Sequence, residues 1–386
     1  MIPYGRQDIC DSDIDAVIEV LKSDFLTQGP RVPDFEKCVA EKVGASHAVA
    51  VNSATSALHI ACLALDLEPG DRLWTSPISF VASANCGLYC GAIVDFVDID
   101  PETFNMSPAA LEKKLQAAQD NGTLPKVVVP VDMCGQSADL RAIRVLADRY
   151  GFKILEDASH AIGARYDGHY VGDGRYADIT VFSFHPVKII TTAEGGLAVT
   201  NDKALAQTMS LLSSHGITRD PALMTCEKDG AWYYQQIELG FNYRMTELQA
   251  ALGISQMARL DDYVARRAFL ADRYNRLLEG LPLRSPRQMD ETASSWHLYI
   301  IQLEDASLHN RVFDFLRDVG VGVNLHYIPI HRQPYYQKMG FSTGDFPVAE
   351  DYYTRAISIP LFPTMTEDQQ DYIVSCLRDI LPGAAA

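Results

Sequence analysis

Several features that would place this sequence of 386 residues in other classes of protein are missing from it. No uncharged apolar run approaches the roughly 20 residues that a helix needs to span a bilayer. The first residues, 1–8, lack the basic flank and the apolar core of a signal peptide. We therefore expect no membrane association and a cytoplasmic location.

Positive charge is also scarce. Lysine and arginine number 33 against 50 aspartates and glutamates, which gives a formal net charge of −17. Such a balance opposes general attraction to nucleic acid or to an anionic membrane surface, so we predict neither as a partner. An anionic small substrate stays compatible with the charge if local donors gather around it.

The sequence has no Cys-x-x-Cys pair among its 8 cysteines. Cys86 and Cys90 lie four residues apart on an expected helix and could be imagined as two metal ligands. No nearby pair of histidines or cysteines would complete such a site. We expect buried, reduced thiols and no metal.

A dinucleotide-binding fingerprint is present in form but not in its proper context. Residues 172–177, Gly-Asp-Gly-Arg-Tyr-Ala, match the Gly-x-Gly-x-x-Gly/Ala pattern, but they precede an expected strand instead of opening a helix after one. We interpret these glycines as turn residues, which argues against an NAD-dependent sugar oxidoreductase.

What the sequence does have is an alternation of β-rich runs with helical periodicity over residues 47–200. This pattern is typical of a largely parallel sheet covered by helices on both faces. The composition, with 47% hydrophobic and 22% charged residues, is sufficient to bury such a core. Strands are expected at 47–52, 72–76, 93–97, 126–131, 153–157, 179–183 and 196–200, and helices at 55–65, 81–89, 108–118 and 140–150.

A long helical pattern at 246–278 marks the passage to a second region. The sequence thus predicts a large domain at 1–245, whose N-terminal segment packs on the small domain, and a smaller α+β domain at 246–386. In the second region we expect strands at 296–301 and 322–326 and helices at 311–319 and 367–380.

Small hydroxyl residues occupy the expected turn between the first strand and the helix after it. The run at 52–58, Asn-Ser-Ala-Thr-Ser-Ala-Leu, places them where free backbone N–H groups and the helix dipole favour a phosphate. Capping of the helix by Ser53 or Thr55 explains the same residues equally well, so both interpretations stay open.

Asp157 and Lys188 follow two expected strands, and parallel sheets place their ligands at the carboxyl ends of strands. Asp157 could pair there with a protonated pyridine nitrogen, although a carboxylate that caps the following loop is the alternative. Lys188, near Phe182 and Phe184, could be a partly desolvated amine suited to Schiff-base chemistry, although most lysines are simply solvated. The two side chains could therefore face a common site.

Taken in order along the chain, the motifs resemble those of the sugar-nucleotide aminotransferases, a family of fold-type-I enzymes that depend on pyridoxal phosphate (PLP). The likeness runs from residue 3 to residue 380. The motifs are Leu-Thr-Gln-Gly-Pro at 26–30, Asn-Ser-Ala-Thr-Ser-Ala-Leu at 52–58, Ser-Pro-Ile-Ser-Phe at 76–80, Glu-Asp-Ala-Ser-His at 156–160, Phe-Ser-Phe-His-Pro-Val-Lys at 182–188, Glu-Gly-Gly at 194–196, and Gly-Phe-Asn-Tyr-Arg-Met-Thr-Glu-Leu-Gln at 240–249.

The resemblance implies an α/β structure of the PLP transferase fold type I, like that of aspartate aminotransferase, and a homodimer. Lys188 would hold PLP as a Schiff base and shuttle a proton, Asp157 would pair with the ring nitrogen, and pyridoxamine phosphate would be the intermediate form. The other expected cofactor contacts are Phe80 on the pyridine face, Ala54, Thr55 and Ser183 at the phosphate, His160 near the phenolic oxygen where many relatives carry glutamine, and Asn242 at the phosphate of the neighbouring subunit's cofactor.

Within the family, the motifs at 182–188 and at 326–331, His-Tyr-Ile-Pro-Ile-His, are most similar to the aminotransferases of pseudaminic acid biosynthesis. The resemblance then implies transfer of the amino group of L-glutamate to C4 of a UDP-linked 4-keto-6-deoxy-N-acetylhexosamine. Sugars of the bacillosamine, perosamine or lipid A type are the alternatives. The expected sugar-nucleotide contacts, some of which could instead pack the N-terminal segment on the small domain, are Tyr4, Phe25, Leu26, Thr27, His326, Tyr327 and Pro329.

Lys188 also bears on two further alternatives. Related sugar dehydratases carry histidine at this position, so the lysine argues against that class of enzyme. A non-catalytic binding protein would be expected to lose Lys188, Asp157 or the phosphate turn, and the sequence keeps all three. We therefore favour an enzyme.

Overall fold

A computed structural model describes residues 1–381 of the chain. Its centre is a sheet of seven strands, all of which the sequence pattern predicted, with boundaries that differ by a few residues at most. Only β9 runs antiparallel to its neighbours in this sheet, so the prediction of a largely parallel sheet is confirmed. In spatial order the strands are β1 (His47–Val51), β9 (Gly196–Thr200), β8 (Ile179–Ser183), β5 (Lys153–Asp157), β4 (Val127–Val129), β2 (Arg72–Thr75) and β3 (Ile93–Phe96).

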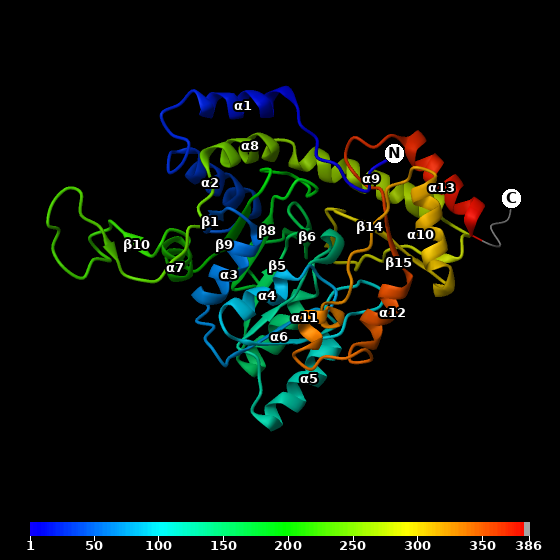
Figure 1. Cartoon of the computed structure of the whole chain (residues 1–386), viewed down its shortest axis with the longest axis horizontal. Helices are drawn as coiled ribbons and strands as arrows, with labels where there is room; N and C mark the ends of the chain where they lie inside the picture. The colour runs from blue at the N-terminus through cyan, green and yellow to red at the C-terminus, as the bar shows by residue number, and fades with distance from the viewer. Residues whose placement is uncertain (382–386) are drawn as a thin grey trace.

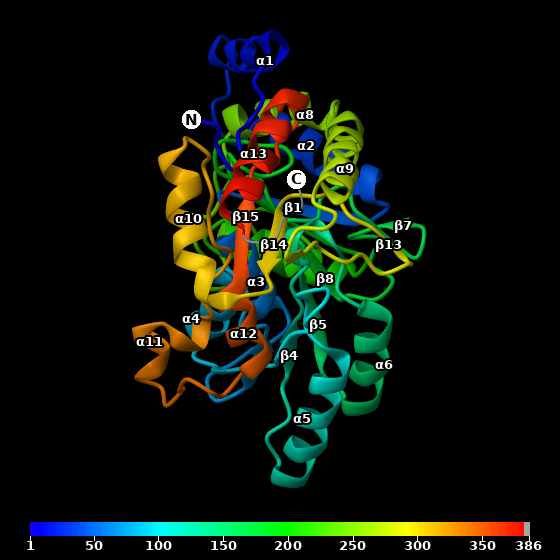
Figure 2. The same ribbon diagram turned by 90° about the vertical axis from the view of Figure 1, so that its right-hand side faces the viewer.

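Helices cover both faces of this sheet because successive side chains of a strand point to opposite faces. Leu73 in β2 belongs to the same core as helices α3 and α4, whereas its neighbour Trp74 packs with α5 and α6 on the other face. Figure 2 shows these two layers on either side of the strands. The covering helices are α3 (Ala54–Ala64), α4 (Ala82–Tyr89), α5 (Pro108–Asn121), α6 (Leu140–Tyr150) and α7 (Lys203–Ser213).

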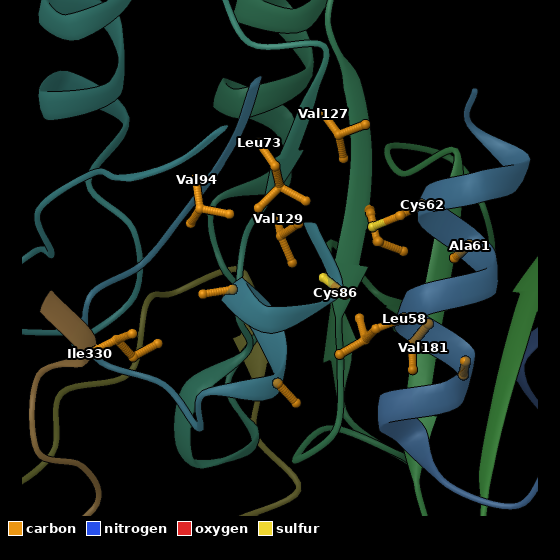
Figure 3. Packing of buried hydrophobic residues seen from close by; sticks show 14 of the residues in the cluster. Leu58, Ala61, Cys62, Leu73, Cys86, Val94, Val127, Val129, Val181 and Ile330 are labelled. Carbon is orange, nitrogen blue, oxygen red and sulfur yellow. The ribbon is translucent and has the colours of Figure 1, made fainter. Parts of the chain in front are cut away.

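The core beneath α3 and α4 contains thiols as well as aliphatic side chains (Figure 3). Cys62 of α3 and Cys86 of α4 are fully buried, beside Val129 of β4 and Val181 of β8. Three further cysteines, Cys90, Cys134 and Cys376, are also buried. The prediction of buried thiols at Cys86 and Cys90 is thus confirmed, whereas Cys10 and Cys38 are partly buried and Cys226 is exposed.

A second, smaller sheet follows in sequence, and its core is separate from those of the large sheet. The helical pattern predicted at 246–278 is divided into two helices, and the first of them begins with a capping box at Thr246. Residues 322–326 do not form the expected strand, because only Asn324 bridges to Ser358 there. The elements are α8 (Glu247–Met257), α9 (Leu260–Leu277), β12 (Leu283–Arg284), β14 (Tyr299–Leu303), α10 (His309–Asp318), β15 (Ala356–Ile359) and α13 (Glu367–Ile380).

The N-terminal residues lie against this smaller part of the chain. Ile2 bridges to Val321, and the backbone of Tyr4 accepts a hydrogen bond of 3.1 Å from the N–H of Leu361. Helices α1 (Asp11–Leu21) and α2 (Arg31–Val43) then pack on α8 (Figure 1). The boundary near residue 245 stays a prediction, and residues 382–386 of the expected small domain lie outside the described part of the chain.

A hairpin arm projects from the body of the molecule beyond α7 (Figure 1). Its strands are β10 (Ile217–Thr218) and β11 (Gln235–Gln236). No helix within residues 1–381 is both long and apolar enough to cross a bilayer. The remaining elements are a sheet of β13 (Thr292–Ala293), β6 (Arg165–Tyr166) and β7 (His169–Tyr170), and helices α11 (Pro334–Gln337) and α12 (Pro347–Arg355).

Candidate active site

A cavity of about 1000 Å³ opens at the carboxyl ends of β5 and β8, beside the N-terminus of α3. The parallel strands bring residues that are far apart in sequence to this one edge, where open α/β sheets bind ligands. Further lining residues for which the sequence predicted no contact with cofactor or substrate include Ser79, Glu194, Gln249 and His297. The predicted residues that line it are Tyr4, Ala54, Thr55, Phe80, Asp157, His160, Ser183, Lys188, His326 and Tyr327.

Five predicted residues do not line this cavity in the single chain. Phe25 and Leu26 are about half exposed, at 52% and 51%, on the segment between α1 and α2. Thr27 follows them and is also exposed. Asn242 lies next to the phosphate turn, with its carbonyl 3.5 Å from Nδ2 of Asn52, and Pro329 precedes the short helical turn at Ile330–Arg332. The contacts expected of these residues stay predictions.

The N-terminus of α3 forms one wall of the cavity. Ser53 caps the helix by accepting a hydrogen bond of 3.1 Å from the N–H of Ser56. The N–H groups of Ala54 and Thr55 have no carbonyl partner within the helix, because they belong to its first turn. Capping by Ser53 therefore leaves these N–H groups for an anion, so the two interpretations of the sequence do not exclude each other, and the phosphate contact stays a prediction.

Gly196, the first residue of β9, passes very close to this helix terminus. A Cβ atom at Gly196 would lie 2.3 Å from the backbone nitrogen of Ala54, a distance that no side chain can occupy. The absence of a side chain lets the strand and the helix approach each other and keeps the N–H groups accessible from the cavity.

Gly196→Ala is therefore expected to displace the α3 terminus and to weaken cofactor binding by about 10-fold or more, since overpacking costs ~1–3 kcal/mol. Titration of the apoprotein with PLP, followed by absorbance, measures the affinity. Gly5→Ala is the matched control, because its Cβ would meet only Val187 at an ordinary 3.7 Å. Equal affinities of the two variants would contradict the proposed phosphate cradle.

Asp157 ends β5, and a chain of hydroxyl groups holds its carboxylate. Ser83 donates a hydrogen bond of 2.6 Å to Oδ2, and the N–H of Ser159 donates one of 3.2 Å to Oδ1. Ser79 lies 2.6 Å from the Ser83 hydroxyl. The sequence reasoning missed both serines, although their spacing of four residues at the start of an expected helix was a usable signal.

Lys188 lies in the loop between β8 and β9, and its backbone N–H donates a hydrogen bond of 2.9 Å to the carbonyl of His185. Burial lowers the pKa of the Lys188 amine to about 8, while the charge of Asp157 opposes that shift. A larger fraction of the amine is therefore neutral near neutral pH than for a solvated lysine, and only the neutral form is a nucleophile.

Three buried histidines, His160, His297 and His326, line the same cavity as the amine. Nε2 of His160 lies 3.1 Å from the hydroxyl of Tyr327, and Nδ1 of His326 lies 2.7 Å from that of Ser358. Burial lowers the pKa of His160 and His297 well below the ordinary value and that of His326 to about 3, and the charge of Lys188 adds to each shift. The three imidazoles are therefore neutral near neutral pH and do not add positive charge beside Lys188.

Two further carboxyl groups, those of Asp132 and Glu156, are buried near Asp157. Oδ1 of Asp132 accepts the N–H of Ala138 at 2.9 Å, and Oε2 of Glu156 accepts the hydroxyl of Thr180 at 2.6 Å. Their remaining oxygens find no other partner among the described residues and face each other as a carboxyl pair. Burial raises the pKa of both groups, that of Glu156 to about 7.

A raised pKa in the folded state stabilises the fold only while the group is protonated. The free energy of unfolding is therefore expected to fall by a few kcal/mol as the pH rises from the ordinary 4.5 of Glu156 through about 7, since each pKa unit is worth about 1.4 kcal/mol. Glu156→Gln should flatten this part of the profile, because the side chain at this position no longer titrates. The fold should be kept, because the amide can still bond to Thr180 and to Asp132.

Urea unfolding at several pH values across this range measures the effect. The matched control is Glu41→Gln, because Glu41 is exposed and makes only a surface ion pair with Lys37. A Glu156→Gln profile as steep as that of the wild type would show that the carboxyl pair does not take up the proton.

The sequence profile of the DegT/DnrJ/EryC1/StrS aminotransferase family matches residues 7–378. The chain belongs to this family. The spore coat polysaccharide biosynthesis protein SpsC of Bacillus subtilis is 40% identical to it, over 99% of this chain and 98% of the relative. A UDP-4-amino-4,6-dideoxy-N-acetyl-beta-L-altrosamine transaminase of Campylobacter jejuni is 38% identical, over 99% of this chain and 98% of the relative.

Solved structures of family members agree with the fold. Helicobacter pylori PseC, an aminotransferase involved in pseudaminic acid biosynthesis, superposes with a TM-score of 0.90 at 32% identity, over 98% of this chain and 99% of its own. Spr1654 of Streptococcus pneumoniae, described as a candidate sugar aminotransferase, has a TM-score of 0.89 in its PMP form at 28% identity, over 98% and 99% of the two chains. The predicted PLP transferase fold of type I is confirmed.

Like other members of this DegT family, the chain is a sugar aminotransferase that uses PLP. The residues that line the cavity fit this cofactor. The first turn of α3 and the cleared space at Gly196 suit a phosphate, and a carboxylate at Asp157 suits a protonated ring nitrogen. The amine of Lys188 and the ring of Phe80 line the same space.

Proposed function

We propose that the chain transfers the amino group of L-glutamate to C4 of a UDP-linked 4-keto-6-deoxy-N-acetylhexosamine. The observation that carries the chemistry is the presence of Lys188, with its lowered pKa, and Asp157 in one cavity beside the α3 terminus. The names of the Campylobacter jejuni relative and of Helicobacter pylori PseC support this class of sugar.

Each residue of the site has a role in this proposal. PLP, when bound, supplies an electron sink for the negative charge that develops at the reacting carbon. Asp157 keeps the ring nitrogen protonated, and Ser83 orients the carboxylate for that contact. The free amine of Lys188 would remove the proton from the α-carbon of the amino donor and would later deliver a proton to C4 of the sugar.

The sugar nucleotide is proposed to enter from the side of the small domain. Tyr4, His326 and Tyr327 line the cavity there, and the Tyr4 and His326 rings lie 5.4 Å apart. A volume of about 1000 Å³ is at the upper end of ordinary small-molecule sites, which suits a cofactor together with a large substrate. No arginine within residues 1–381 lines the cavity, so the diphosphate would have to find its donors elsewhere.

Incubation with glutamate and a panel of 4-keto sugar nucleotides, followed by NMR of the new stereocentre, tests the substrate. We expect amination at C4 of the UDP-linked N-acetylhexosamine. Preference for a sugar of the bacillosamine, perosamine or lipid A type would overturn this choice but not the aminotransferase assignment. The B. subtilis relative, named for spore coat polysaccharide biosynthesis, is a reason to make the panel broad.

A non-catalytic protein that kept the PLP fold is the second candidate. The purified chain is expected to show a near-visible absorption band with PLP, and glutamate should bleach that band. Persistence of the band with glutamate and with every other amino donor would favour a binding protein. The cytoplasmic location expected from the sequence stays a prediction.

We also infer that two copies of the chain form a homodimer that completes each site. The hairpin arm and the loop after it carry large apolar side chains that are exposed to solvent: Trp232 is 74% exposed, Tyr234 51% and Leu239 75%. Such a grouping is typical of a surface that a partner covers. Asn242 follows directly on this segment, and we propose that it reaches the phosphate of the cofactor held by the partner subunit.

Subunit mixing gives a sharp test of this arrangement. Lys188→Ala and Asn242→Ala should each lower activity when alone. In a twofold dimer of the two variants, one site has both defects and the other has none, so remixing should restore up to about a quarter of wild-type activity. If Asn242 instead serves the site of its own chain, each site of the mixed dimer keeps one defect, and mixing restores nothing.

A further inference from the structure

Helix α1 carries a stripe of apolar side chains on its exposed face, and the segment after the helix continues it. Within α1 the members lie four and three residues apart, so they share one face of the helix. All five are large apolar side chains between 38% and 58% exposed: Ile14, Ile18, Leu21, Phe25 and Leu26. We call this set the α1 surface. A grouping of this kind is typical of a face that a partner covers.

The opposite face of α1 is fixed to helix α8 and to the residues that follow it. The side chain of Asp13 is fully buried and forms an ion pair of 2.6 Å with Arg259. Asp13 also accepts a hydrogen bond of 2.6 Å from the hydroxyl of Ser255. Val20, seven residues further along α1, is buried as well. Because the inner face is held in this way, the α1 surface is a preformed part of the fold and always points outward.

The segment after α1 is connected to the hairpin arm through Glu247. The backbone N–H of Glu247 donates a hydrogen bond of 3.0 Å to the carbonyl of Leu26, and its carboxylate accepts the N–H of Arg31 at 2.7 Å. Glu247 begins α8, only eight residues after Leu239 in the loop that follows the arm. The segment after α1 and the arm both lie on the left of the molecule in Figure 1. The α1 surface therefore continues the exposed apolar side chains of the arm.

The area of the arm indicates that it is only part of an interface. Its three exposed side chains, Trp232, Tyr234 and Leu239, offer roughly 400 Å², since large side chains of this kind bury about 150–250 Å² each. A stable pair of proteins usually buries about 800 Å² on each partner. The side chains of the α1 surface add roughly another 400 Å², which brings the total close to that value.

The charges around the α1 surface oppose a lipid partner. Four exposed acidic residues lie among its members in the sequence: Asp11, Asp15, Glu19 and Asp24. An anionic membrane would repel them, as it would the whole chain with its net charge of −17. At the rim of a protein interface such charges stay in water and cost little.

We propose that the α1 surface packs against a second copy of the chain and forms one dimer interface together with the hairpin arm. This inference rests on the homodimer of the proposed function and names a further surface that holds it together. In a twofold dimer each copy presents both parts to the other, so all of the exposed apolar side chains named above are covered at once.

The double variant Ile18→Glu, Leu21→Glu tests the inference. Glutamate is a good helix former, so α1 should still fold, but the dimer would have to bury the new carboxylates. Sedimentation of the holoenzyme over a range of concentrations should show a dissociation constant of the dimer raised by about 100-fold or more. Val145→Glu is the matched control, because Val145 is a 64% exposed apolar residue of α6 outside the α1 surface. Its dissociation constant should equal that of the wild type.

A second measurement uses the wild type alone. With labelled isoleucine methyl groups, a soluble paramagnetic reagent broadens the NMR signals of those methyls that water reaches. In the dimer, Ile14 and Ile18 should be protected, whereas Ile93, which is 47% exposed on β3, should be broadened.

The outcomes separate this inference from the homodimer itself. A dimer in which Ile14 and Ile18 are as accessible as Ile93, or an unchanged dissociation constant of the double variant, would overturn the inference and leave the homodimer in place. Protection that appears only with vesicles of anionic lipid would also overturn it. A wild type that sediments as a monomer would instead overturn the proposed homodimer.

Discussion

Lys188→Ala is expected to bind PLP but to lower kcat of both half-reactions by about 10²- to 10⁴-fold, the range that proton transfer by a positioned side chain contributes. The cofactor should remain bound because the α3 terminus, Ser183 and Asp157 do not depend on the lysine. Its near-visible band should shift, since the covalent link to the protein is lost.

Stopped-flow absorbance with glutamate, and separately with the keto sugar, measures the two half-reactions. Lys37→Ala is the matched control, because that side chain is 73% exposed and takes part only in a surface ion pair with Glu41. Turnover of Lys188→Ala close to that of the wild type would reject Lys188 as anchor and proton shuttle. Loss of cofactor binding in the variant would show instead that the noncovalent contacts are weaker than proposed.

Asp157→Asn is expected to lower kcat by about 10²- to 10⁴-fold as well. Breaking a buried ion pair by removing one partner costs ~3–5 kcal/mol, and about 1.4 kcal/mol corresponds to a tenfold change in rate. The asparagine oxygen can still accept from Ser83 or from the N–H of Ser159, so the fold around the site should be kept. Thermal unfolding of the variant checks that point.

Ser83→Ala separates the charge of Asp157 from its orientation. This change removes one hydrogen bond to the carboxylate but leaves the charge, and such a bond is worth about 1.5–3 kcal/mol. We expect a loss of about 10- to 100-fold, smaller than that of Asp157→Asn measured side by side. Equal activity of Asp157→Asn and the wild type would contradict the proposed pairing with the ring nitrogen.

Most of the large sheet followed from local sequence patterns. Runs such as 127–129 and 179–183 are short, apolar and rich in β-branched residues, so their local sequence predicts buried strands. The segment at 322–326 looked similar but makes only an isolated bridge from Asn324 to Ser358. Pairing with a neighbour decides whether such a run becomes a strand, and that information is not local.

The missed site residues also depend on contacts that are distant in sequence. Ser83 meets Asp157 across 74 residues. His297 was placed in an expected strand, and nothing in its neighbourhood in the sequence indicated that it would pack on His160. The motifs predict which residues contact the cofactor. The residues that orient those side chains lie on other elements, which are distant in sequence and pack behind them.

The sequence by itself determined the alternation of strands and helices, the order of the motifs and the candidates Lys188 and Asp157, because periodicity, turn residues and motif spacing are properties of the local chain. Only the tertiary structure brought Tyr4 and Tyr327 into the same cavity as those two residues, lowered the pKa of the lysine, and gathered three neutral histidines beside it. Burial and the approach of distant elements produce these effects, and neither exists until the chain has folded.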